Sequence, residues 1–289
     1  MKNKMKTITQ SQKMMIFVLS MSLYGLATLL TELIPKFQVG IVEFSVEYFL
    51  FIPLVLAMLF DPLSAALGAA TGEIVFSEIM LGQFGGVGEL EKFLTLTIGI
   101  YIAGRMVKDP LNRKMVGIAA LTGVIVQQAM GCAVDILKVQ FAIESFEAVA
   151  GLPESVFFTE GFAFLNDVLF SGILFCFLPT LYLVPRLYRK IEPLLGMKPR
   201  DKNTVLGGDK VFSVKVVILS IVGFVGAVLF EFMSEVGINF IDWEAEWAES
   251  MGAVGISMLT ALIVALLVFN FMKKRAAMNQ TEQGSGQID

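Results

Sequence analysis

The sequence predicts an all-α protein that crosses a membrane several times. Of its 289 residues, 56% are hydrophobic and only 17% are charged, and the mean hydropathy is +0.74, well above what a soluble core needs. The apolar residues gather in long runs, and a spanning helix needs about 20 residues. No alternating β-barrel pattern is present. Because backbone groups inside a bilayer must be paired within the protein, these runs are predicted to be helices.

Eight apolar runs predict eight spanning helices. They are residues 14–34, 48–60, 62–82, 93–107, 115–137, 158–184, 213–234 and 251–272. The first run is too long for the core of a signal peptide and ends at Glu32 and Pro35 without a small-residue cleavage site, so we expect it to be retained. The second run is short, and a tight turn at Asp61 and Pro62 separates it from the third.

Basic residues predict the orientation of these helices. Of the 22 lysines and arginines, 19 fall in the amino-terminal segment, the loop after the fourth run, the stretch after the sixth run and the carboxyl-terminal segment. The positive-inside rule places these four segments, and therefore both termini, in the cytoplasm of a multi-pass, lipid-embedded protein of the cell membrane. Only Lys36, Lys92 and Lys138 remain on the outer side, where the loops are acidic.

Composition also predicts the domain organisation. Residues 1–185 form a six-helix substrate-binding membrane unit, and residues 186–212 form a basic cytoplasmic linker with Pro193 and Pro199. A two-helix membrane appendage follows over 213–275. The tail 276–289 is polar and is predicted to be disordered.

The residues that are missing restrict the chemistry. The chain contains no histidine, which excludes Ser-His triads, His-ligated zinc and the HExxH motif. The stretch GGVGELEK at 85–92 lacks the Lys-Ser/Thr pair of a phosphate-binding loop. An intramembrane enzyme is a third hypothesis, and no GxGD or paired-glutamate motif accompanies the acids to support it. We therefore expect a protein that is not an enzyme, with no cofactor, metal or nucleic-acid partner.

Acidic residues within the apolar runs indicate a pocket. Ionisable groups cost about 2.5–3.5 kcal/mol each in a spanning helix and usually face a cavity or a partner. Six of them fall in the middle or outer part of their helices: Glu32, Glu73, Glu78, Asp135, Glu160 and Asp167. A water-filled pocket open to the outside accounts for this asymmetry. Helix-to-helix hydrogen bonding is the other interpretation, and we favour it for Glu32 and Glu160, which lie near helix ends.

The third run carries small residues on one face. Ser64, Gly68 and Gly72 are spaced by four residues, which lets two helix backbones approach closely in lipid. We expect these three positions to serve helix packing.

Segment 42–78 resembles the substrate-binding S components of energy-coupling factor (ECF) transporters. An outer loop leads into a short helix, Asp61 and Pro62 form a tight turn, and a small-residue helix with Gly68, Gly72 and two glutamates follows. The chain departs from that family in two places. The small residues of the first helix, Ser20, Ser22, Gly25 and Ala27, are not spaced by four, and the last two helices have no counterpart in six-helix members.

The resemblance implies high-affinity capture of a vitamin or another small micronutrient from outside the cell. The partners that it implies are a transmembrane coupling protein and two cytoplasmic ATPases. A pocket between loops 35–47 and 82–92 and the outer halves of helices four to six is expected to bind the substrate. The predicted substrate-binding residues are Glu47, Glu78, Gln128, Asp135, Asn166 and Asp167. Buried carboxylates without buried lysine or arginine in the outer half favour a substrate with an amine or a quaternary nitrogen.

An autonomous, ion-driven secondary transporter is the alternative function. Asp135 or Asp167 would then relay a proton or a cation. Such transporters often contain inverted repeats with broken helices, and segments 14–107 and 115–234 show no matched pair. Transport without an ATPase distinguishes the two hypotheses.

Overall fold

A computed structural model describes most of the first 237 residues of the chain. The described residues are 8–39, 42–46, 48–82, 84–146, 152–200 and 213–237, and all of them belong to one compact unit, Met1–Ile241. The predicted site residue Glu47, the linker residues 201–212, the eighth apolar run and the tail lie outside the described residues.

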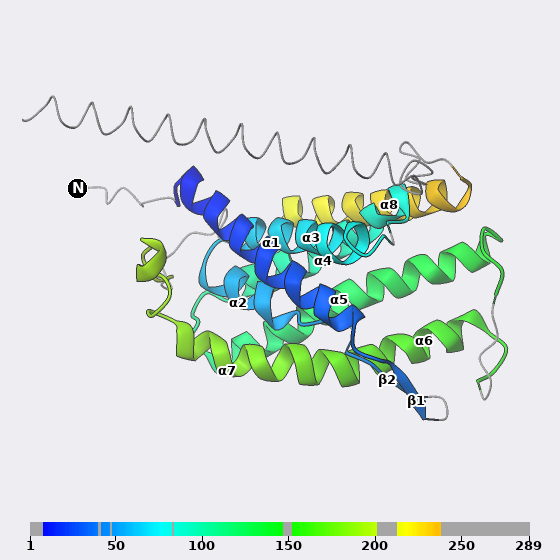
Figure 1. Cartoon of the computed structure of the whole chain (residues 1–289), viewed down its shortest axis with the longest axis horizontal. Helices are drawn as coiled ribbons and strands as arrows, with labels where there is room; N and C mark the ends of the chain where they lie inside the picture. Colours follow the sequence, from blue (N-terminus) through cyan, green and yellow to red (C-terminus); the bar gives the residue numbers. More distant parts are fainter. Residues whose placement is uncertain are drawn as a thin grey trace, which may run out of the picture. The chain divides into compact units, whose positions relative to one another are not determined.

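Helices account for nearly all of the regular structure (Figure 1). The α-helices are α1 Gln10–Glu32, α2 Phe51–Leu59, α3 Pro62–Glu73, α4 Glu89–Met106, α5 Arg113–Gln140, α6 Val156–Asp167, α7 Leu178–Leu187 and α8 Val214–Glu235. Two π-helical segments, η1 Ile74–Ile79 and η3 Val168–Phe177, continue α3 and join α6 to α7. Short 3₁₀ turns are η2 Gly86–Gly88 and η4 Pro193–Leu195. These helices coincide with seven of the eight predicted apolar runs.

Four helices among the described residues are long and apolar enough to cross a membrane. They are Gln10–Glu32, Arg113–Gln140, Val156–Leu187 and Val214–Glu235. The chain thus has the helices of a membrane protein.

A small β-hairpin, which the sequence did not predict, follows α1. Strand β1 (Phe37–Val39) pairs antiparallel with β2 (Val42–Phe44), with Phe37 opposite Phe44 and Val39 opposite Val42. In Figure 1 the hairpin extends from the end of α1. Its ladder pairs part of the backbone in the connection between α1 and α2.

Local sequence fixes several helix starts. Thr9 caps α1 in a capping box with Gln12, which satisfies two amide groups that have no partner inside the helix. Asp61 caps α3, where its carboxylate accepts hydrogen bonds from the amide and the hydroxyl of Ser64 at 2.9 and 2.7 Å. Pro62, at the first position of α3, has the backbone angle that a helix start requires. Ser64 therefore belongs to the first turn of α3.

Helices α1 and α3 pack with their backbones in very close approach. A Cβ placed on Gly68 would lie 2.3 Å from the carbonyl oxygen of Phe17, and one on Gly72 would lie 2.3 Å from that of Met21. Because the backbones approach so closely, the hydroxyl of Ser20 donates a hydrogen bond to the Ala65 carbonyl oxygen at 2.7 Å. Gly68 and Gly72 thus lie where only a residue without a side chain fits.

The short helix α2 lies at the centre of the bundle. Leu54, Ala57 and Met58 are fully buried, and α2 contacts α1, α3, α4 and α7. A helix that is apolar on all sides is one that neighbouring helices surround. The second apolar run is therefore a core helix, which explains why it is shorter than a membrane span.

Helix α8, the first helix of the predicted appendage, packs along α4. Gly223 faces Ile98 and Gly226 faces Leu94, so small residues again bring two helices together. The opposite side of α8 is exposed and apolar, as at Ile218 and Leu219. Helix α8 thus belongs to the same compact unit as the preceding helices.

Candidate functional site

Lys92 organises one group of charges where α4 begins. Its ammonium lies 3.0 Å from the carboxylate of Glu78, at the end of η1, and 3.2 Å from that of Glu89. Glu78 and Glu89 are buried, whereas half of the Lys92 side chain is exposed. Glu89 also accepts a hydrogen bond from the amide of Gly85 at 3.2 Å. The ion pairs therefore join the end of the third apolar run to the first turn of α4.

Lys138 organises a second group, which involves three elements. Its ammonium lies 3.2 Å from Asp135 of α5, 3.2 Å from Glu144 in the following turn, and 3.1 Å from Glu231 of α8. An ammonium has three N–H donors, so three carboxylates match it in number. Only 12% of the Lys138 side chain is exposed. Helix α8 thus contributes a carboxylate to the same group as the predicted residue Asp135.

These two groups form what we call the acid–lysine network. The five carboxylates in contact with Lys92 and Lys138 exceed the two lysines by three negative charges. Glu91 adds a further acid in the first turn of α4, before the predicted apolar run. Burial, together with the charges of Asp135 and Glu231, raises the pKa of Glu91 to about 7. The network is therefore able to accept additional positive charge or a proton.

A non-helical segment enters the bundle ahead of α2. Ser45, Tyr48 and Leu50 are at most 5% exposed. The hydroxyl of Tyr48 donates a hydrogen bond to the Asp167 carbonyl oxygen at 3.3 Å, and the hydroxyl of Ser171 donates one to the Ser45 carbonyl oxygen at 3.0 Å. Irregular backbone at membrane depth is tolerated where it is buried in protein or lines a cavity. This segment thus brings polar backbone groups among the helices.

The two π-helical segments coincide with predicted site residues. Glu78 lies in η1, and Asp167 immediately precedes η3. In η1 the hydroxyl of Ser77 donates a hydrogen bond to the Glu73 carbonyl oxygen at 2.6 Å. Widened turns of this kind occur frequently at functional sites, because they displace backbone and side chains from regular helical positions.

The predicted site residues are divided between these features. Glu78 and Asp135 belong to the acid–lysine network, and Asp167 lies at the buried segment through its backbone. Gln128 and Asn166 are half-buried on α5 and α6. The expectation that no lysine is buried in this half was wrong for Lys138. Glu78 and Asp135 each have a lysine partner already, so neither carboxylate needs a substrate cation to neutralise it.

Sequence reasoning missed Lys92, Lys138, Glu231 and Tyr48. The two lysines had a signal, because they are among the three basic residues that the orientation analysis left on the acidic side. Lys138 also lies three positions after Asp135, on the same helical face. Glu231 had no such signal, since its contact with Lys138 joins residues 93 positions apart.

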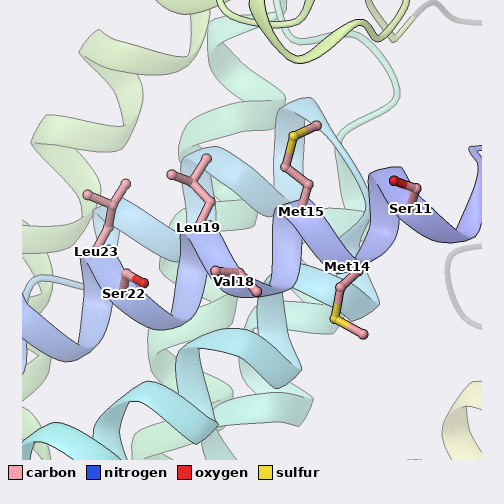
Figure 2. A pocket seen from close by; sticks show the side chains of 7 residues that line it. All are labelled: Ser11, Met14, Met15, Val18, Leu19, Ser22 and Leu23. Carbon is pink, nitrogen blue, oxygen red and sulfur yellow. The ribbon is translucent and has the colours of Figure 1, made fainter. Parts of the chain in front are cut away.

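A shallow groove runs along the outside of α1 (Figure 2). Its lining residues are Ser11, Met14, Met15, Val18, Leu19, Ser22 and Leu23. Met15, Leu19 and Leu23 project to the same side of the helix. Because one helix supplies the whole lining, the groove does not enclose a solute. The small residues of α1 lie on different sides of the helix. Ser22 lines the groove, whereas Ser20 and Gly25 face α3.

Comparison with protein families gives a match over most of the chain. No curated protein and no solved structure matches the chain. The profile of a family of unknown function, DUF8171, matches residues 15–281. Because this match covers nearly the whole chain, including most of α1, all of α2 to α8 and the acid–lysine network, the chain belongs to the DUF8171 family.

Proposed function

We propose that this protein captures a small micronutrient at the outer side of the cell membrane, as the S component of an ECF-type transporter. The buried residues Ser45, Tyr48 and Leu50 ahead of α2 carry the proposal. Hydrogen bonds of the Tyr48 and Ser171 hydroxyls hold irregular backbone between the helices. The resemblance of segment 42–78 to S components assigns an outer loop ahead of a short helix to the same place.

The orientation in this proposal follows the basic residues. The acid–lysine network faces outside, and both termini lie in the cytoplasm. The six-helix unit 1–185 binds the substrate, and two further helices follow it. Two of the basic residues, Arg105 and Arg200, are only 5% and 3% exposed. Because they are not solvated charges, they do not count toward the orientation. The remaining basic residues of the four segments still favour this orientation.

The network supports a substrate that carries positive charge. Its surplus of carboxylates attracts cations toward the outer end of α4, and the raised pKa of Glu91, about 7, allows this acid to take up a proton near neutral pH. In this proposal Glu78, Asp135 and the carboxylates around them favour a vitamin-like solute with an amine or a quaternary nitrogen. Asn166 and Gln128 supply neutral hydrogen-bonding groups.

The partners in the proposal are a transmembrane coupling protein and two cytoplasmic ATPases. In this proposal the coupling protein contacts the groove on α1. The small residue Ser22 lines this groove and is not used in the packing of α1 against α3, so it is available to a partner helix. The S component itself performs no chemistry and holds no cofactor.

Identification of the co-purified solute tests the proposal directly. The full chain is purified from cells grown in rich medium, and released small molecules are identified by mass spectrometry. A binding titration then compares the parent with Tyr48→Ala. We expect Tyr48→Ala to weaken binding at least tenfold, because the ring is 5% exposed and fixes the buried segment.

Tyr182→Ala is the matched control, since Tyr182 is 56% exposed and stacks with Arg186 on the outside of α7. We expect it to bind as the parent does. Equal binding by Tyr48→Ala contradicts a site at the buried segment. Uptake by the purified chain alone in liposomes with an ion gradient, without an ATPase, favours the secondary transporter instead.

A further inference from the structure

Residues 188–200 form a strap across the bundle end where α2 and α4 finish. After α7 the chain turns at Arg189 and Gly196, which have backbone φ angles of +66° and +63°. The side-chain amide of Gln12 donates a hydrogen bond to the Gly196 carbonyl oxygen at 2.9 Å, and the hydroxyl of Tyr188 donates one to the Arg200 carbonyl oxygen. The strap thus connects α7 to α1 and ends at Arg200.

The guanidinium of Arg200 holds the strap to two helix ends. It donates hydrogen bonds to the carbonyl oxygens of Gly104, Val107 and Ala57, each at 2.9 Å, and to that of Phe60. These carbonyls lie in the last turns of α4 and α2, where no amide of the same helix is available to them. The carboxyl-terminal end of a helix carries partial negative charge, so a planar cation with several donors fits the position.

Arg200 is deeply buried in this cage. Its exposure is 3%, and burial lowers its pKa to about 9, so the guanidinium remains protonated at neutral pH. The charge of Asp61, the cap of α3, favours the protonated guanidinium. Arg200 therefore joins the ends of α2 and α4 to the turn between α2 and α3.

The strap also contains a feature that opposes this closed arrangement. Glu192 is fully buried, and neither of its carboxylate oxygens has a hydrogen-bond partner in the described part of the chain. A carboxylate without a partner is strongly destabilised when water is removed from it. Detachment of the strap lets water reach Glu192 and the four carbonyl oxygens. Arg200 thus favours the closed strap, and Glu192 favours its release.

We propose that the strap is a removable closure of this end of the bundle, which Arg200 holds in place against the unfavourable burial of Glu192. Helix α4 runs from the acid–lysine network to this closure, a length of about 27 Å for its 18 residues. The assignment of the closed end to the cytoplasm rests on the proposed function, but the closure itself does not.

A cysteine reporter at Val107 tests the closure. Val107 is fully buried and its carbonyl oxygen contacts Arg200. Val107→Cys is introduced into the full chain with Cys132→Ala and Cys176→Ala, and its reaction with a maleimide is followed in detergent. We expect Arg200→Ala to accelerate the reaction at least tenfold. Millimolar guanidinium should restore slow labelling, because it refills the carbonyl cage.

Two further variants complete the test. Glu192→Gln should label more slowly than the parent, because it removes the buried charge that opposes closure. Arg186→Ala should label as the parent does, since Arg186 is exposed and stacks on Tyr182 at 4.3 Å.

Equal labelling of Arg200→Ala and the parent overturns the proposal. So does equal acceleration at a core reporter, Val124→Cys, because Arg200 would then maintain the whole fold. Neither result depends on substrate binding, so the proposed function is tested separately.

Discussion

Substitution of Gly68 by alanine should destabilise the protein through the contact between α1 and α3. The added Cβ would lie 2.3 Å from the Phe17 carbonyl oxygen, and ordinary contact begins near 3.4 Å. The two helices must therefore separate by about 1 Å, since packed helices have no free space to take up the difference. Overpacking of this kind costs about 1–3 kcal/mol.

The same separation should break a hydrogen bond. The Ser20 hydroxyl lies 2.7 Å from the Ala65 carbonyl oxygen, and an additional 1 Å takes this pair beyond hydrogen-bonding distance. Its loss adds about 1 kcal/mol. We therefore expect Gly68→Ala to reduce the free energy of unfolding by about 2–4 kcal/mol in total.

Thermal unfolding in detergent measures this effect. The buried thiol of Cys176 becomes reactive to a fluorogenic maleimide as the protein unfolds, in a Cys132→Ala background. Gly131→Ala and Gly161→Ala are the controls, because both glycines are helical and have no atom within 4 Å of an added Cβ. They should be neutral or stabilising by up to about 1 kcal/mol. An unfolding temperature of Gly68→Ala equal to that of these controls refutes the reasoning.

Three other substitutions are tested in the same unfolding assay. Lys138→Met should lower stability by about 1–3 kcal/mol, because three carboxylates lose their common partner although two of them are about half exposed. Lys92→Met should lower stability by at least as much, although its side chain is 50% exposed, because it leaves the buried carboxylates of Glu78 and Glu89 without their common partner, and a loss below about 1 kcal/mol contradicts this reasoning. Glu192→Gln should raise stability by about 1 kcal/mol, because it removes a buried charge without a hydrogen-bond partner among the described residues. A decrease in unfolding temperature contradicts that interpretation.

The helices were predictable because length and hydropathy determine them. Seven predicted apolar runs coincide with helices, and the short second run is a core helix. The hairpin was missed because strands of three residues, such as Phe37–Val39, leave no periodic pattern. The π-helical segments were also missed, since an i→i+5 hydrogen bond does not alter the hydropathy of a run.

The candidate site was predictable only where partners lie on one helix. Asp135 and Lys138 are three residues apart, so their pairing follows from helix geometry. Glu78 and Lys92 lie on different elements, and Glu231 comes from a helix that was assigned to a separate appendage. In the sequence, Arg200 could not be distinguished from the other basic residues of the linker. Its acceptors are backbone carbonyl oxygens, which every residue has, so no side chain in the sequence marks its partners. Sequence patterns identify the charged residues but do not identify acceptors of this kind.

The last prediction concerns the pair formed by α4 and the helix α3–η1. A cation holds this pair at each end: Lys92 joins α4 to Glu78 of η1, and Arg200 joins the end of α4 to Phe60, just before α3. Substitutions this far apart are usually additive within about 0.5 kcal/mol. If the pair separates only when both ends are free, Lys92→Met combined with Arg200→Ala should lose at least about 1 kcal/mol more than the sum of the single losses. Double-mutant unfolding measurements decide this, and additive losses would show that the two ends are held independently.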